Sequence, residues 1–171
     1  MFAATGVRVG WAMGPAVIMK KMNAIMSHIG SWAPMAEQKA VAAFLLKKEA
    51  IDTYLDGFRA GLAERLRRIY DGFMELKREG FNVDVLAPEA GIYLTIKIDL
   101  AGKQVKGGAL IGNQQEVTSF LLNEAGLAVV PFSAFGAPKT SPWYRLSVGT
   151  CRLDDIPEMF LKLRGALKKL A

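Results

Sequence analysis

The sequence predicts a mixed α/β to α+β fold in three parts: a piece of a larger α/β lobe over residues 1–46, a long connecting helix over 47–80, and a small α+β domain with a short sheet over 81–171. Two observations support this prediction. Apolar side chains recur at steps of three and four residues over Leu55–Leu76, which is the period of one helix face. After Gly80 the apolar residues alternate, which is typical of strands in a half-buried sheet.

The first part contains a short apolar run followed by two segments of helical composition. Val7–Met13 ends at Gly14-Pro15, and this short length between breakers predicts a buried strand. Proline is tolerated in a first helical turn, so a helix is expected over Ala16–Met26. The alanine-rich segment Met35–Leu46 predicts a second helix.

The last part predicts four strands and two helices. Its final helix is expected to begin at Asp155, with Glu158 at capping-box spacing. A short helix closed by Gly126 precedes the third strand. The strands are expected at 81–86, 92–98, 127–130 and 144–148, and the short helix around 117–124.

Composition and charge exclude several classes of function. The chain carries a formal net charge of +6, but its basic residues lie in helical segments beside acids or at helix ends, which favours a solvated surface over a nucleic-acid or membrane partner. A zinc site is implausible because the sequence has one histidine, His28, and one cysteine, Cys151. The single cysteine and the lack of a signal peptide or a long apolar run make the cytoplasm the expected compartment.

Two arginines occupy apolar surroundings. Arg8 lies between Val7 and Val9, and Arg145 lies in the strand predicted over 144–148. One interpretation places each guanidinium on the exposed side of a strand, where its charge is solvated. The other is a guanidinium held for an anion, since its planar fork matches carboxylate and phosphate.

Three motifs resemble the class I and II aminotransferases, the fold type I family that depends on pyridoxal 5'-phosphate (PLP). Phe2–Pro15 resembles the segment after the Schiff-base lysine, with its Gly-x-Arg-x-Gly-aromatic pattern followed by Gly-Pro. Ala128–Gly136, followed by Tyr144–Val148, resembles a second family stretch, and Pro88–Leu94 is a weaker third match. The motifs occur in the family's order, so the resemblance covers essentially the whole chain.

The resemblance implies a role for each arginine. Arg8 resembles the arginine that binds the PLP phosphate, and Arg145 resembles the one that binds the substrate α-carboxylate. The Schiff-base lysine is expected just before Met1, so no catalytic residue is assigned within the chain and no metal is expected. Two lesser matches concern Ser31-Trp32, where relatives often place a loop near the neighbouring subunit's active site, and Phe132, which replaces a common glycine and would narrow the pocket.

The resemblance also implies the fold and the chemistry. Residues 1–46 become a remnant of the large PLP-binding domain, 47–80 the interdomain helix and 81–171 the small domain. The expected reaction moves an amino group between an amino acid and a 2-oxo acid in a homodimer, and the chain alone is expected to be inactive. The alternatives are a non-catalytic small-lobe module for binding or dimerisation and, less favoured, a basic nucleic-acid binder.

Overall fold

A computed structural model describes residues 4–30 and 32–170 of the chain. The chain divides into two units, residues 1–58 and 59–171, and the boundary falls inside the long helix α3 (Lys48–Arg78). The three-part domain division predicted from the sequence stays a prediction.

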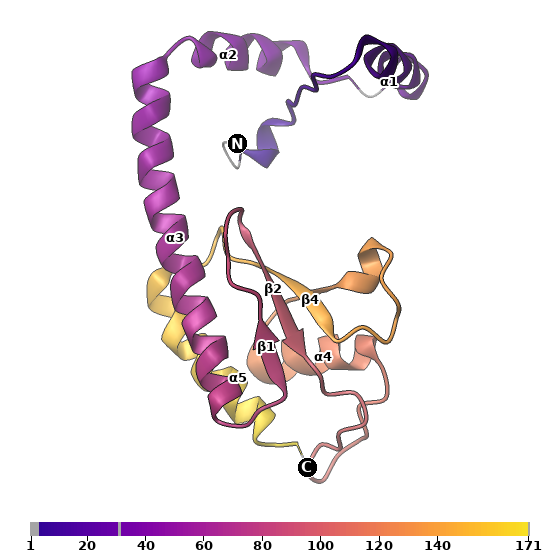
Figure 1. Ribbon diagram of the computed structural model, residues 1–171, viewed down its shortest axis with the longest axis vertical. Coiled ribbons are helices and arrows are strands. Elements are labelled where there is room, and N and C mark those ends of the chain that lie inside the picture. Colours follow the sequence, from indigo (N-terminus) through magenta and orange to yellow (C-terminus); the bar gives the residue numbers. More distant parts are fainter. Residues whose placement is uncertain (1–3, 31, 171) are drawn as a thin grey trace. The chain divides into compact units, whose positions relative to one another are not determined.

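Unit 1 is helical (Figure 1). A 3₁₀ turn, Thr5–Val7, precedes α1 (Ala16–Ile29) and α2 (Met35–Leu45). The strand predicted over Val7–Met13 is wrong, because the residues between the 3₁₀ turn and α1 have no regular secondary structure. A strand needs a neighbour to satisfy its backbone groups, and the described residues of this unit provide none.

Helix α3 (Lys48–Arg78) confirms the long amphipathic segment. Within unit 2 its apolar stripe is buried at Leu66, Ile69, Phe73 and Leu76. The helix ends where expected: Gly80 adopts a φ of 93° and donates its backbone N–H to the Lys77 carbonyl at 3.1 Å. A left-handed conformation of this kind favours glycine.

The sheet of unit 2 has the strand order β1-β2-β4-β3, and every neighbouring pair is antiparallel. The third predicted strand, 127–130, is largely wrong, because only its last residue pairs. Leu127 and Val129 are buried in the core without pairing to β4, so their alternation reports burial and not a ladder. The strands are β1 (Val83–Val85), β2 (Tyr93–Ile98), β3 (Val130–Pro131) and β4 (Trp143–Ser147).

Two further helices complete unit 2, α4 (Gln114–Ala125) and α5 (Ile156–Leu167). The capping box expected at Asp155 is wrong, because Asp155 belongs to a 3₁₀ turn and makes no side-chain cap hydrogen bond. A side-chain N-cap occurs instead at α4, where Asn113 Oδ1 accepts from the Glu116 N–H at 3.0 Å and the Glu116 carboxylate accepts from the Gly112 N–H at 2.6 Å.

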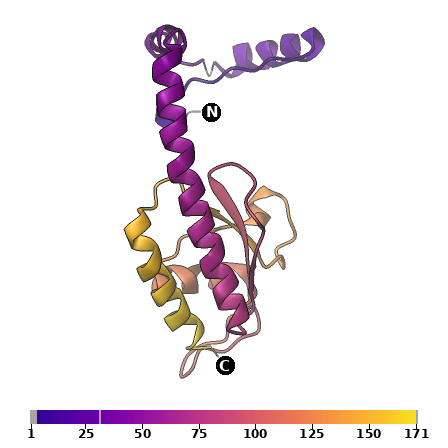
Figure 2. The ribbon, with the colours of Figure 1, turned by 60° about the vertical axis from the view of Figure 1, so that its left-hand side comes forward.

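One face of the sheet packs against the helices and forms the core. Alternate residues such as Leu94, Ile96 and Leu146 are buried there together with the apolar faces of α3, α4 and α5. Figure 2 shows α3 and α5 on one side of the sheet. The opposite face carries Tyr93 and Arg145, which are exposed or half-buried.

Candidate functional site

Arg145 lies on β4, an interior strand of the sheet, and is half-buried. It pairs with Thr95 on β2 and with Val130 on β3. Side chains alternate between the two faces of a strand. Because Tyr144 and Leu146 enter the core, the guanidinium of Arg145 lies on the face that the helices leave open.

Two aromatic rings contact this guanidinium. Its Cζ atom lies 4.3 Å from the ring centroid of Tyr93 and 4.6 Å from that of Phe135. Tyr93 belongs to β2, on one side of β4, and Phe135 follows β3, on the other side. The guanidinium forms no salt bridge within the described part of the chain. Its N–H donors therefore remain available for a bound anion.

The turn that carries Phe135 is tied to α4 by Gln114. This turn is the 3₁₀ segment Phe132–Phe135. The Ser133 hydroxyl donates to Gln114 Oε1, and Gln114 Nε2 donates to the Ser141 carbonyl at 2.6 Å. One side chain thus holds both ends of the loop between β3 and β4.

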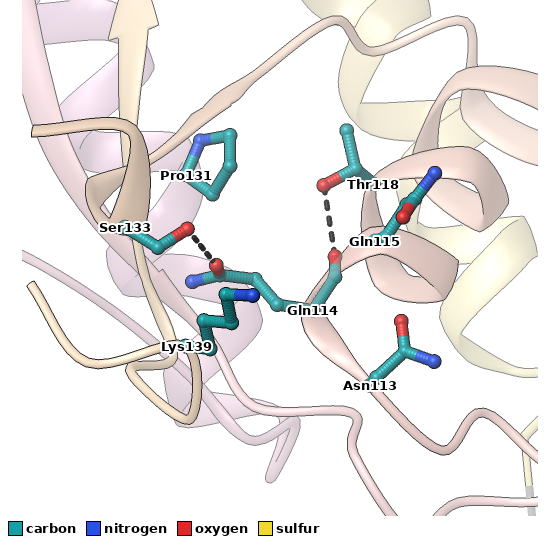
Figure 3. Close-up of a pocket in the computed structure, with 7 residues that line it drawn as sticks. All are labelled: Asn113, Gln114, Gln115, Thr118, Pro131, Ser133 and Lys139. Carbon is teal, nitrogen blue, oxygen red and sulfur yellow. Dashed lines mark hydrogen bonds between the residues drawn. The ribbon is translucent and has the colours of Figure 1, made fainter.

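Figure 3 shows the residues that line a pocket around this anchor. The volume of the pocket is about 490 Å³. Three of its residues are hydrogen-bonded to one another: Ser133 donates to the Gln114 side chain, and the Gln114 carbonyl accepts from Thr118 Oγ1 at 2.9 Å. We interpret the pocket as part of the loop anchor. The lining residues are Asn113, Gln114, Gln115, Thr118, Pro131, Ser133 and Lys139.

Arg8 belongs to unit 1 and is exposed. Among the described residues it is the one non-glycine with a positive φ, at 59°. This left-handed conformation costs roughly 1–2 kcal/mol for a residue with a Cβ. Backbone strain of this kind is concentrated at ligand sites, which motivates a binding hypothesis for Arg8.

Other residues considered from the sequence do not form a site. Ser31 lies outside the described residues, and Trp32 and His28 are exposed. Burial, followed by the charge of Asp155, raises the pKa of the Cys151 thiol, which opposes a role as nucleophile. The described residues contain no group of three His, Cys, Asp or Glu side chains suited to a metal, and none of their helices could cross a bilayer.

Three residues around Arg145 have no function assigned from sequence patterns: Tyr93, Phe135 and Gln114. The strand register indicates the contact of Tyr93 with Arg145. Arg145 pairs with Thr95, and Tyr93 is two residues before Thr95, so Tyr93 and Arg145 are diagonal neighbours on one face of the sheet. Phe135 and Gln114 reach the site through a turn and a helix start, which strand periodicity does not report.

The family model for aminotransferase class I and II matches residues 1–159. This chain belongs to that family. It is 27% identical over 170 residues to a probable aspartate/prephenate aminotransferase of Rickettsia prowazekii, with 99% of this chain and 40% of the relative covered. The segment thus spans about 40% of the length of such relatives.

Solved aminotransferase structures share the fold. The aspartate aminotransferase of Rhizobium meliloti matches with a TM-score of 0.72 and 26% identity, over 99% of this chain and 40% of that one. LysN, the α-aminoadipate aminotransferase of Thermus thermophilus, solved with N-(5'-phosphopyridoxyl)-L-leucine, matches with a TM-score of 0.73 and 22% identity, over 96% and 39% respectively. These matches confirm the predicted fold class, that of part of an aminotransferase.

Proposed function

We propose that this chain is the C-terminal part of a PLP-dependent enzyme that moves an amino group between an amino acid and a 2-oxo acid. Family membership over residues 1–159 supports the reaction class. The observation that carries the proposal is the state of Arg145, which has two rings around its guanidinium and no acidic partner in the described part of the chain.

Arg145 is the proposed group that binds the substrate α-carboxylate. A guanidinium offers parallel N–H donors that match the two oxygens of a carboxylate. The half-buried position of Arg145 on the open face of the sheet leaves room for such a ligand while reducing competition from water. Binding at this end would orient the α-amino group of the substrate and fix which atom is presented to the cofactor.

Arg8 is the proposed contact to the phosphate of PLP. A guanidinium fits a phosphate chemically, and the left-handed backbone at Arg8 is consistent with a side chain held for one purpose. PLP, when bound, supplies an electron sink for the α-carbon of the amino acid. The part of this chain in that chemistry would be to hold the phosphate and the carboxylate.

The resemblance of the first motif implies that the family's Schiff-base lysine lies outside these 171 residues. We therefore propose that these residues by themselves do not transaminate. Assembly as a homodimer is part of the same proposal and follows from the family. The non-catalytic binding module is the outcome that would replace it.

The proposal can be tested by carboxylate binding to the 171-residue chain. Propionate is titrated while the Nε–Hε resonance of Arg145 is followed by NMR, with neutral propionamide as the matched control. We expect a saturable shift with propionate, none with propionamide, and loss of binding in Arg145→Gln. Equal propionate affinity in Arg145→Gln would overturn the carboxylate role.

The reaction itself is tested on the product of the complete reading frame that contains these residues. With PLP, an amino acid and a 2-oxo acid, we expect exchange of the amino group in that product and none in the 171-residue chain. A complete product that forms stable assemblies but exchanges no amino group with any standard donor would favour the binding module.

A further inference from the structure

We propose that Tyr93 and Phe135 are positioning residues, an aromatic clamp that fixes the guanidinium plane of Arg145 for a ligand carboxylate. The proposal rests on the carboxylate role of Arg145 given above. The two rings are the proposed reason that the guanidinium is held in one orientation. Neither ring needs to contact the ligand for this role.

The clamp follows from where the two rings originate. Arg145 Cζ lies 4.3 Å from the Tyr93 centroid and 4.6 Å from the Phe135 centroid, within the range of cation–π attraction. Tyr93 lies on β2 and Phe135 lies in the 3₁₀ turn that follows β3, and β2 and β3 flank β4 on opposite sides. Two rings that reach the guanidinium from the β2 side and from the β3 side of β4 would restrict its rotation and reduce its contact with water, and no salt bridge within the described residues occupies its N–H donors.

A carboxylate needs that edge. Bidentate pairing places both carboxylate oxygens in the plane of the guanidinium, so a fixed plane reduces the freedom lost on binding. A long arginine side chain on an open sheet face would otherwise sample several rotamers. The clamp thus converts a flexible cation into an oriented one.

Core packing does not account for the two rings. Tyr93 is 44% exposed and Phe135 is 54% exposed, so each leaves much of its ring in solvent. Both rings contact the guanidinium of Arg145. Their removal should therefore affect Arg145 far more than the stability of unit 2.

Phe132 supports one half of the clamp. Its ring lies 6.1 Å from that of Phe135, in an edge-to-face arrangement with an interplanar angle of 66°. The turn that carries both rings is held by the Ser133 hydroxyl on Gln114. Phe132 therefore contacts the Phe135 ring and limits its movement.

The test uses the 171-residue chain and the variants Tyr93→Leu and Phe135→Leu. Ordering of one rotamer-rich side chain is worth about two- to tenfold in affinity, so we expect propionate to bind about two- to tenfold more weakly to each variant. The Arg145 Nε–Hε resonance should also lose its ring-current shift. Matched controls that keep the rings, Tyr93→Phe and Phe135→Tyr, should retain both properties.

The outcomes separate this proposal from the one on which it rests. If Arg145→Gln abolishes propionate binding while both leucine variants bind as tightly as the parent with an unchanged Arg145 resonance, the clamp is wrong and the carboxylate role stands. If Arg145→Gln binds propionate normally, both proposals fail. Denaturant midpoints within experimental error of the parent show that a weakened leucine variant is still folded, and Phe132→Ala should reproduce part of the Phe135→Leu effect.

Discussion

Substitution of Gly72 by alanine should destabilise unit 2, although helix propensity alone predicts the opposite. A Cβ atom on residue 72 would lie 2.3 Å from Cε2 and 2.4 Å from Cζ of Phe160. Carbon atoms in favourable contact are about 3.5–4.0 Å apart, so the ring would have to move by more than about 1 Å. Phe160 is only 7% exposed and packs edge-to-face on the fully buried Phe73 at 5.4 Å, which leaves it little room.

The magnitude follows from two opposing effects. Replacement of glycine by alanine inside a helix gains about 0.5–1 kcal/mol, and overpacking of a core costs about 1–3 kcal/mol. The net expectation for Gly72→Ala is a loss centred near 1 kcal/mol and at most about 2.5 kcal/mol. A Cβ atom at Gly165, on α5 in the same unit, would meet nothing within 4 Å among the described residues beyond the backbone of its own helix. Gly165→Ala should therefore show the gain without the cost.

The assay is denaturant unfolding followed by the fluorescence of Trp143, which is half-buried on β4 in unit 2. Because the propensity gain is common to both variants, the difference between Gly72→Ala and Gly165→Ala isolates the overpacking cost. In a Phe160→Ala background the cost should vanish and Gly72→Ala should become stabilising. Equal stabilisation by Gly72→Ala and Gly165→Ala in the parent chain would refute the packing argument.

Three further predictions concern the loop anchor and two titrating groups. Gln114→Ala should release both ends of the β3–β4 loop, and the resulting disorder of Phe135 should weaken propionate binding by about two- to tenfold. The neighbouring substitution Gln115→Ala should leave propionate binding unchanged. Faster hydrogen exchange over residues 132–141 in Gln114→Ala would report the loosened loop. Burial, with a smaller contribution from Asp99, raises the pKa of Tyr144 from 10.0 to about 12. An unfolded tyrosine ionises first, so stability should fall as the pH rises from about 10 to 12, and Tyr144→Phe should flatten that part of the denaturation profile. A hydrogen bond from Lys77, and a weaker effect of the one from the Val85 N–H, hold the pKa of Asp84 below its ordinary 3.8. The stability that this carboxylate contributes is therefore complete above pH 3.8 and is lost as the pH falls below it. Asp84→Asn should reduce the acid sensitivity of unfolding. An unchanged acid limb in Asp84→Asn would show that the Lys77 pair contributes nothing.

The sequence predicted best where periodicity is set by local packing. The stripe of α3 and the alternation of β2 and β4 each bury one face, and their positions were correct within a residue or two. Val7–Met13 was wrong because a short apolar run does not reveal whether a partner strand is present. The boundary of β3 was wrong because Leu127 and Val129 are buried without pairing to β4, and an alternating apolar pattern does not distinguish the two cases.

The candidate site was predictable only in part. Arg145 stood out because a charged residue interrupts an apolar strand, and its neighbours on the ladder follow once the strand order is known. The contact with Phe135 depends on a turn whose direction is fixed by a distant glutamine, Gln114. Interactions of this kind join residues far apart in the chain, and no local pattern encodes them.

The two arginines differ in what their positions depend on. The rings that contact the Arg145 guanidinium, Tyr93 and Phe135, lie within unit 2, as does the Gln114 anchor. A carboxylate could therefore be held by unit 2 whatever the surroundings of Arg8. The roles proposed for the two arginines can therefore be tested separately: a variant at Arg8 should leave the propionate affinity unchanged, whereas variants of the proposed aromatic clamp should lower it in the absence of any cofactor.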